Sequence, residues 1–249
     1  MGYNLQYSYV NCWYCGGHTL QSALKELLGI PYRDAIALSS TFQKHVLEKV
    51  SLKNRILVYP KTEALLKSHR SYLKNRGFDP EDIQRLWKIE SIGMAPSSNL
   101  QHRIVIPIHY HGEVVSWTTR SISKYSNHRY ISAKPEQELI DHKSILYGMD
   151  FCRHRCIVVE GPLDVWKVGP GAVCTFGTNY SQAQVNKIAM FPQRAICFDG
   201  EDTAQKQANR LAHDLSVLPG ETTVIELDKG TDPGSLEGND LKYIQRFLK

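Results

Sequence analysis

The sequence predicts an α/β fold, in which residues 156–249 form a parallel sheet with helices on both faces. Apolar runs typical of buried strands alternate there with helical patterns. An acidic group follows each of three such runs. Upstream, residues 61–155 contain two consecutive strand patterns that a short turn separates, which predicts a mixed α+β subdomain with an antiparallel pair.

The elements before residue 156 follow from helix-end and turn signals. Three helices are predicted, over residues 20–28, 62–75 and 80–87. The third helix has Pro80 at its first position after Asp79, which is a common helix start. Two strands are predicted over residues 104–109 and 113–121, and the short link between them predicts a hairpin. Residues 31–60 give no clear pattern.

The elements after residue 156 alternate in type. Strands are predicted over residues 156–159, 195–198 and 223–227, and helices over residues 181–190, 202–215 and 240–248. Helical crossovers of this kind are what parallel strands need, because all the strands run in the same direction. We therefore divide the chain into an N-terminal segment, a connecting region and two subdomains. Their boundaries are residues 1–30, 31–60, 61–155 and 156–249.

The composition excludes some classes of protein. The chain has 249 residues, of which 42% are hydrophobic, enough for a core in one or two domains. It has no apolar run of about 18 residues, so we expect no membrane span. Its N-terminus lacks the pattern of a signal peptide. The six cysteines are dispersed, which favours the reducing cytoplasm over a disulfide framework.

The net charge of +5 is unevenly distributed. Residues 156–249 carry 9 Lys and Arg against 12 Asp and Glu, whereas residues 1–155 carry 21 against 13. A basic part beside an acidic part fits a nucleic-acid channel that leads to a cation-loaded site. The alternative is an ordinary solvated surface, since Lys and Arg are mostly exposed in proteins.

The three acidic groups predict a metal site. They are Glu160-Gly161-Pro162-Leu163-Asp164, Asp199-Gly200-Glu201-Asp202 and Asp228-Lys229-Gly230-Thr231-Asp232. The carboxyl ends of parallel strands lie along one rim of a sheet, and ligands bind there. Carboxylates gathered on one rim repel each other unless a cation compensates them, and Mg²⁺ takes carboxylate and phosphate oxygens as ligands. The alternative is that each group merely caps a helix.

These acidic motifs resemble those of a known family. The order E-G-x-x-D, D-G-E-D-x-A and x-D-P is similar to the Toprim domain of bacterial-type primases, topoisomerases and some nucleases. Segments further upstream resemble DnaG-type replicative primases in particular. They are residues 72–78, 103–108, 112–120, 129–132 and 142–149, and residues 9–17 resemble the second knuckle of the zinc ribbon of these primases. The chain is identified as a member of this family, and its brevity favours a virus- or plasmid-encoded member.

The resemblance implies a site for nucleotidyl transfer with two metal ions. Catalytic roles are expected for Glu160, Asp199 and Glu201. Mg²⁺ or Mn²⁺ is expected at Glu160, Asp199, Glu201 and Asp232, with Asp164 and Asp202 as supporting groups. The family more often has Asp at the position of Glu201 and a third carboxylate at the position of Gly234. One metal position is therefore expected to be weaker.

The same resemblance implies a basic wall beside the carboxylates. Arg120, Arg129 and Lys143 match positions where the family places cations near nucleotide phosphates and template, and a guanidinium can bind a phosphate through two hydrogen bonds. Less certain additions are Lys124, Arg153 and Arg155. The alternative for each is an exposed surface charge. Six histidines of this region are interpreted as having no role: His102, His109, His111, His128, His142 and His154.

Cys12 and Cys15 supply half of a structural zinc site, which needs four ligands. Three interpretations stay open: the true N-terminus is missing, the zinc has been lost, or the site is completed elsewhere. His18 and the segment 152–156 offer further ligands for the last case. We expect weak zinc binding or none, and in that case no recognition of a template sequence.

The expected function is that of a DNA primase, which makes short RNA primers on single-stranded DNA from ribonucleotides. Its expected partner is a replicative helicase, which would be a separate protein or be contacted differently than in the family, and no membrane partner is expected. A metal-dependent Toprim nuclease would need the same carboxylates but not the segment 103–120. A non-catalytic single-stranded DNA-binding or loading protein with a decayed Toprim site is the other alternative. The sequence does not predict the template preference or the oligomeric state.

Overall fold

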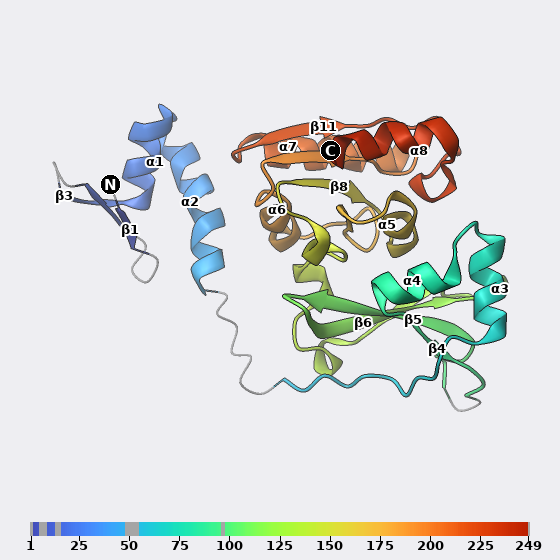
Figure 1. The fold of residues 1–249 in the computed structure, drawn as a ribbon. Coiled ribbons are helices and arrows are strands. Elements are labelled where there is room, and N and C mark those ends of the chain that lie inside the picture. Colours follow the sequence, from blue (N-terminus) through green and yellow to red (C-terminus); the bar gives the residue numbers. More distant parts are fainter. Residues whose placement is uncertain (1, 5–8, 13–15, 48–54, 96–97, 249) are drawn as a thin grey trace. The chain divides into compact units, whose positions relative to one another are not determined.

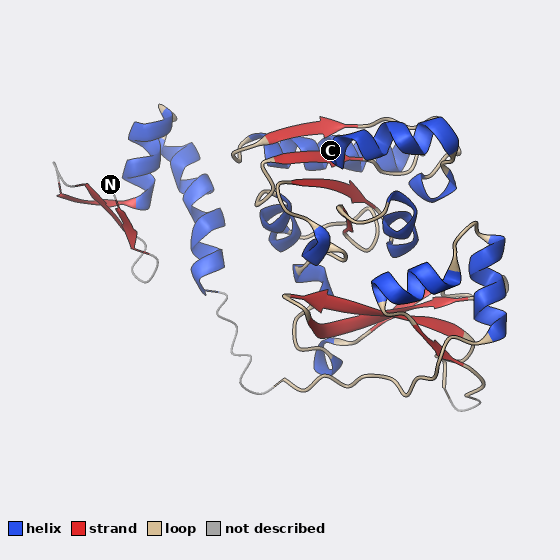
Figure 2. Cartoon of the chain, in the orientation of Figure 1, coloured by secondary structure: helices blue, strands red, loops and turns tan. Residues whose placement is uncertain are grey.

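The computed structural model divides into two compact units, residues 1–54 and residues 55–249. It describes residues 2–4, 9–12, 16–47, 55–95 and 98–248. Figure 1 colours the chain along its sequence, and Figure 2 colours it by secondary structure. None of the helices in these stretches has the length and apolar character needed to cross a lipid bilayer.

The first unit is a small antiparallel sheet followed by two helices. Strands β1 (Gly2–Asn4), β2 (Tyr9–Cys12) and β3 (Gly16–Thr19) pair in that order. Helix α1 (Leu20–Leu28) is confirmed, with the Thr19 hydroxyl accepting a hydrogen bond from the Ser22 amide. It packs against α2 (Tyr32–Leu47), which the sequence did not predict. Apolar residues of α2 such as Tyr32 and Ile36 are exposed, so the helix lacks a one-sided apolar pattern.

The second unit begins with an antiparallel sheet of order β4-β5-β6-β7. Its strands are β4 (Glu90–Ile92), β5 (Arg103–Tyr110), β6 (Glu113–Ser121) and β7 (Tyr130–Ser132). The predicted hairpin between β5 and β6 is confirmed. Its two-residue link, His111-Gly112, has φ of 54° and 82°, and positive φ at both residues is what the favoured two-residue hairpin turn requires.

Two helices, α3 (Lys67–Asn75) and α4 (Pro80–Trp87), lie over this sheet (Figure 1). The predicted start of α3 at residue 62 was wrong. Glu63 forms a β-bridge with Ser91, and the Ser91 hydroxyl accepts a hydrogen bond from the Leu66 amide, so the chain stays extended to Leu66. The predicted start of α4 is confirmed, because the Asp79 carboxylate accepts hydrogen bonds from the first free amides of the helix.

The predicted parallel sheet is confirmed, with the order β11-β10-β8-β9 and every neighbouring pair parallel. Its strands are β8 (Arg155–Val159), β9 (Ala172–Cys174), β10 (Gln193–Ile196) and β11 (Glu221–Val224). Helices α5 (Pro162–Val168), α6 (Gln182–Ile188) and α7 (Asp202–Ser216) connect successive strands, and α8 (Gly238–Gln245) follows the last. Short 3₁₀ turns occupy residues 135–137, 142–144, 149–151, 233–235 and 246–248.

Three details of the sheet prediction were wrong. The sequence did not predict β9, whose three residues are too few for a pattern. Strands β10 and β11 end at Ile196 and Val224, two and three residues before their predicted ends. After these points the chain leaves the ladder and forms the turns that carry the acidic residues, so apolar character continues beyond the paired strand.

One hydrophobic core joins the two sheets of the second unit. Ile104, Ile106 and Ile108 of β5 share it with Ile157 and Val159 of β8. Their neighbour on β5, Val105, points to the opposite face of the antiparallel sheet and packs there against Trp117. The shared core fixes the parallel sheet against the antiparallel one, so the residues lining the space between them keep a defined geometry.

Candidate active site

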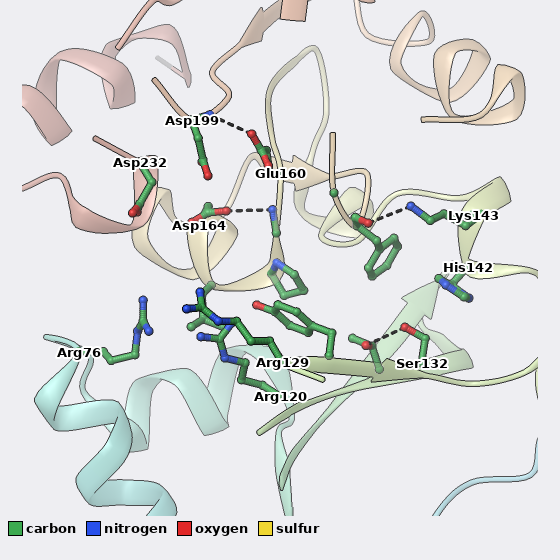
Figure 3. Close-up of a pocket in the computed structure, with 17 residues that line it drawn as sticks. Arg76, Arg120, Arg129, Ser132, His142, Lys143, Glu160, Asp164, Asp199 and Asp232 are labelled. Carbon is green, nitrogen blue, oxygen red and sulfur yellow. Dashed lines mark hydrogen bonds between the residues drawn. The ribbon is translucent and has the colours of Figure 1, made fainter. Parts of the chain in front are cut away.

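A pocket of about 340 Å³ is lined by residues from both sheets of the second unit. Its charged groups are separated by sign (Figure 3). Glu160, Asp164, Asp199 and Asp232 lie on one side, and Arg76, Arg120 and Arg129 lie on the other. Within the described residues, no ion pair joins the two groups. A ligand that carries both a cation and anionic oxygens would complement the two sides.

The end of β8 and the turn into α5 place the first two carboxylates. Glu160 directly follows β8, and its Oε1 accepts a hydrogen bond from the Asp199 amide at 3.1 Å. Asp164 lies in the first turn of α5, where its Oδ2 accepts a hydrogen bond from the Gly161 amide at 2.9 Å. Both carboxylates are thus held by the backbone, and neither depends on a flexible side-chain partner.

Two glycines let the other carboxylates come close. A Cβ on Gly200 would lie 2.1 Å from the Asp228 carbonyl oxygen, so only glycine allows the segment after β11 to approach the end of β10. The Gly200 amide also donates a hydrogen bond to the Thr231 carbonyl at 2.8 Å. A Cβ on Gly234 would lie 2.7 Å from Asp164 Oδ1 and 3.0 Å from Asp232 Oδ1. Gly234 therefore leaves the space that these two carboxylates occupy, and a side chain there would displace them.

The acidic side has the electrostatics of a cation site. Burial, with repulsion from Asp199 and Asp232, raises the pKa of Glu160 to about 7. Burial and neighbouring carboxylates likewise raise the pKa of Asp164 to about 7 and that of Asp199 to about 6. Asp199 Oδ1 is buried without a hydrogen-bond partner, which is costly unless something else satisfies it. A divalent cation fits these residues, because it would remove the repulsion and supply the missing partner.

Glu201 and Asp202 are placed differently from the other predicted ligands. Both are exposed and neither lines the pocket. Asp202 forms an exposed ion pair with Lys229 at 3.4 Å. Glu201 stands at the start of α7, and its charge contributes to the raised pKa of Asp199. Glu201 and Asp202 could bind a metal ion in the pocket only if the backbone at the start of α7 moved toward it. Their metal roles therefore stay predictions.

The basic side is built from three separate segments. Arg76 follows the last residue of α3, and Arg120 lies on β6. The Arg120 guanidinium donates to the Tyr72 hydroxyl at 3.0 Å and lies over the Tyr130 ring, 4.9 Å from its centroid. Arg129 precedes β7, and buried Arg103 fixes this segment by donating to the carbonyls of His128 and Arg129. Arg120 and Arg129 therefore line the pocket, and their contact with nucleotide or template stays a prediction.

Lys143 also lines the pocket, but its ammonium is already engaged. It donates to the carbonyl oxygens of Thr175, Phe176 and Asn179 at 3.0, 2.8 and 3.2 Å. Three donors are all that an ammonium has. Burial lowers the pKa of Lys143. Lys143 thus ties down the segment after β9, and its predicted contact with nucleotide or template would require these hydrogen bonds to break.

A second group of titratable residues borders the pocket. Glu138, Asp141 and His142 lie close enough for ligand atoms of all three to fall within 4.8 Å of one another. It is the one such group of three or more that the described residues form, so the pocket carboxylates are more widely spaced. Glu138 and His142 are joined by a hydrogen bond of 3.0 Å between Glu138 Oε2 and His142 Nδ1.

Among the residues that line the pocket, Arg76 and Tyr130 were not predicted, His142 was assigned no role, and Asp164 was assigned only a supporting one. Arg76 lies inside a motif that carried the family resemblance, and this was the signal that could have identified it. Tyr130 likewise lies in such a motif. Asp164 was expected only as a supporting group, yet it lines the pocket. His142 was read as an ordinary histidine, and no sequence signal marks its pairing with Glu138.

The predicted partial zinc site lies largely outside the described residues. Cys15 is not among them, and Cys12 is described only as the last residue of β2. Of the more distant candidate ligands, Cys152 and Cys156 are free thiols, and burial raises the pKa of Cys152 to about 12. A metal needs a thiolate, so these two cysteines are poor ligands in this conformation. Zinc binding stays a prediction.

No protein-family model matches this chain. A DNA primase of Chlamydia pneumoniae is 22% identical over an alignment of 293 positions, which covers 92% of this chain and 49% of that primase. A DNA primase of Chlamydia trachomatis is 26% identical over 208 residues, covering 66% of this chain and 34% of the relative. The chain is thus similar in sequence to bacterial DNA primases. It spans about half the length, or less, of these curated relatives.

Solved DnaG-type structures have the same fold. The zinc-binding and RNA polymerase domains of Aquifex aeolicus primase match with a TM-score of 0.65 at 20% identity, over 97% of this chain and 72% of that one. The RNA polymerase domain of Mycobacterium tuberculosis primase matches with a TM-score of 0.60 at 20% identity, over 74% and 76% of the two chains. The expected α/β fold of a DnaG-type catalytic core is therefore confirmed.

Proposed function

We propose that this protein is a primase, which joins ribonucleotides into short RNA primers on a single-stranded DNA template. The observation that carries the proposal is the separation of charge in the pocket, with four carboxylates facing three arginines. A nucleoside triphosphate with bound divalent cations has the complementary pattern. The DnaG-type fold and the primase relatives support the same activity.

The acidic side is the proposed place of the metal ions. Asp199, Glu160, Asp164 and Asp232 would hold Mg²⁺ or Mn²⁺, since all four line the pocket and oxygen ligands suit these hard cations. When bound, such ions neutralise the charge that develops on the attacking and leaving oxygens of phosphoryl transfer. Glu201 and Asp202 would add ligands only after a change in the turn that precedes α7.

The basic side is the proposed place of the phosphates. Arg120 is held rigidly by Tyr72 and Tyr130, so it can donate to a phosphate without first losing side-chain entropy. Arg129 is fixed through Arg103, and Arg76 comes from the end of α3. Together they would orient the nucleotide so that its α-phosphate lies beside the carboxylates. The template would then lie along the subdomain formed by residues 61–155.

The decisive experiment incubates the purified chain with Mg²⁺, single-stranded DNA and labelled ribonucleotides. Short labelled RNA that depends on both the DNA and the metal supports the proposal. A parallel reaction with end-labelled DNA and no ribonucleotides tests for cleavage, which would instead indicate a Toprim nuclease. DNA binding that is independent of Mg²⁺, with no product in either reaction, would indicate a non-catalytic binding protein.

A replicative helicase is the proposed partner, and this part rests on the family resemblance alone. The test is whether primer synthesis on a long template rises when a purified replicative helicase is added. Unchanged synthesis, together with separate migration of the two proteins in gel filtration, would remove the helicase from the proposal.

A further inference from the structure

The loop between β6 and β7, residues 122–129, presents an aromatic ring to the solvent. Tyr125 is 82% exposed, more than any other large apolar or aromatic side chain of the described residues. Apolar stabilisation scales with the area that folding removes from water, so this ring contributes little to the stability of the fold. A reason for its presence has to be sought outside the folded chain.

The loop is nevertheless held in a defined conformation from within the protein. Arg103 of β5 is only 3% exposed. Its guanidinium donates to the Ser126 hydroxyl and to the carbonyls of His128 and Arg129. Burial and the charge of Arg120 lower the pKa of Arg103, so keeping this cation inside the protein costs free energy. A buried cation therefore fixes a loop whose aromatic ring points into solvent.

The same loop carries positive charge without acidic neighbours in sequence. Residues 121–129 contain a lysine and an arginine but no Asp or Glu. The Lys124 ammonium lies 5.0 Å from the centroid of the Tyr125 ring. Within the described residues, neither Lys124 nor Arg129 forms an ion pair. An open aromatic ring among free cations is typical of surfaces that bind single-stranded nucleic acid, where bases stack on the rings.

The loop leads from the pocket and returns to it. Arg120 precedes the loop on β6 and Arg129 ends it, and both line the basic side of the pocket (Figure 3). Tyr125 is four residues before Arg129, so the two Cα atoms are at most about 14 Å apart, the reach of four extended residues. Tyr125 itself does not line the pocket. A strand that continues beyond the pocket is therefore better placed to meet the ring than a nucleotide held inside it.

We propose that Tyr125 stacks against a base of the single-stranded template just outside the pocket. Lys124 lies over one face of the ring, so the base stacks on the other face. The inference rests on the proposed function, because it takes the bound strand to be the template. Every base has a π-face, so Tyr125 holds the template without selecting a sequence.

The test measures the Kd of labelled single-stranded DNA by fluorescence anisotropy, at several salt concentrations and without ribonucleotides. Tyr125→Ala removes the ring, whereas Tyr125→Phe keeps the ring and removes only the hydroxyl. Tyr243→Ala, at an exposed tyrosine of α8, is the matched control. A second probe is an abasic strand of the same length, which has the phosphates but no bases. Melting temperatures, primer synthesis and the KM of ribonucleotides are measured in parallel.

The expected result is a loss of affinity that depends on both the ring and the bases. Tyr125→Ala should raise the Kd of DNA about 10-fold, which corresponds to about 1.4 kcal/mol and lies in the range for stacking of one base. Tyr125→Phe and Tyr243→Ala should bind DNA like wild type. The abasic strand should bind wild type and Tyr125→Ala equally well. The salt dependence should keep its slope in Tyr125→Ala, because stacking releases no counterions.

Other outcomes overturn the proposal. If Tyr125→Ala binds DNA like wild type, the ring does not contact the strand. Equal weakening on the normal and the abasic strand, or a lowered melting temperature, would show that the ring acts through the shape of the loop. If only the KM of ribonucleotides rises, the base belongs to the nucleotide and the template assignment is wrong.

Failure of the proposed function would look different. A wild-type chain that makes no primers but loses DNA affinity in Tyr125→Ala would contradict the primase activity and support the stacking contact. Primer synthesis by wild type, with unchanged DNA binding in Tyr125→Ala, would overturn the stacking contact alone.

Discussion

Glu160 and Asp199 stand on neighbouring parallel strand ends, and the Asp199 amide donates to Glu160 Oε1 at 3.1 Å. This hydrogen bond orients the Glu160 carboxylate toward Asp199. Among the neighbouring charges, that of Asp199 contributes most to the raised pKa of Glu160. Two ionised carboxylates held side by side repel each other, which costs electrostatic free energy. Such perturbed groups in a pocket mark a functional site, which makes this pair the centre of the proposed chemistry.

Asp199→Ala should abolish primer synthesis and leave single-stranded DNA binding intact. The side chain sits where the cation is expected, whereas the DNA should be held by the basic subdomain. A loss of at least about 10³-fold in kcat is expected if the metal is no longer held. Glu226→Ala, which removes an exposed carboxylate just after β11, is the control and should remain active. Substantial synthesis by purified Asp199→Ala at millimolar Mg²⁺ would contradict the site.

The acidic cluster also predicts how stability depends on pH. Carboxyl groups whose pKa is raised to about 6 or 7 bind protons more tightly in the folded protein than in the unfolded chain, where the pKa is near 4. The metal-free protein is therefore stabilised at low pH, and this contribution is lost as the pH rises from about 4 to about 7. Asp199→Asn removes one charge from the cluster and should be more stable than wild type above pH 7, by about 0.5–2 kcal/mol.

The measurement is the difference in unfolding free energy between Asp199→Asn and wild type, from pH 4.5 to 7.5 without metal. Taking the difference removes groups common to both proteins, such as buried His69, whose pKa is lowered to about 4 and whose contribution runs the other way. Millimolar Mg²⁺ at pH 7.5 should stabilise wild type more than the variant. A difference that stays constant across this range would show that the carboxylates do not repel each other.

Arg120 and Lys143 should respond differently to substitution, although the sequence assigned them the same role. Arg120→Gln should weaken nucleotide or template binding and change the melting temperature less than Lys143→Met does, because Tyr72 is partly exposed and water can replace the guanidinium as the partner of its hydroxyl. Lys143→Met removes a donor from three backbone carbonyls, of which that of Thr175 keeps a hydrogen bond from the Gln184 side-chain amide, and should lower stability by about 1–3 kcal/mol. If Lys143→Met melts like wild type but loses nucleotide binding, the ammonium contacts the ligand directly.

The fold was largely predictable because its signals are local. Buried strands such as β8 and β10 read as apolar runs, and each is followed by an acidic residue of the pocket, Glu160 or Asp199. The position of Glu201 was not predictable in this way. Spacing places it two residues from Asp199, but the direction of its side chain depends on where α7 starts, and Glu201 proves to be exposed at that start.

The parts of the site that escaped prediction depend on contacts between distant segments. Arg76 lines the pocket because α3 ends beside the pocket. The helix was predicted, but its sequence does not show where its end lies relative to the parallel sheet. Glu138 and His142 are four residues apart in a segment without an α-helix, where no periodicity links them. Lys143 matched a family motif, but its three carbonyl partners lie more than 30 residues away. Sequence spacing cannot reveal such partners.

Gly200 allows the segment after β11 to lie against the end of β10, and this contact helps to position Asp232. Substitution of Gly200 therefore tests whether the contact matters for the metal site. The Cβ of Gly200→Ala would lie 2.1 Å from the Asp228 carbonyl oxygen and 2.9 Å from that of Leu227. Both are backbone atoms, so relief requires the segment that leads to Asp232 to move away from the end of β10. We expect a loss of stability of about 1–3 kcal/mol, as for other overpacked sites.

The displaced segment should also weaken the metal site. The hydrogen bond from the Gly200 amide to the Thr231 carbonyl holds the chain one residue before Asp232, and movement would withdraw this carboxylate from Asp199. Gly200→Ala should therefore need several-fold more Mg²⁺ for half-maximal synthesis, at a temperature where it is still folded. Thr203→Ala, at an exposed position in the first turn of α7, adds no volume at the contact and is the matched control. Wild-type metal dependence in folded Gly200→Ala would mean that the approach of these two segments does not position Asp232.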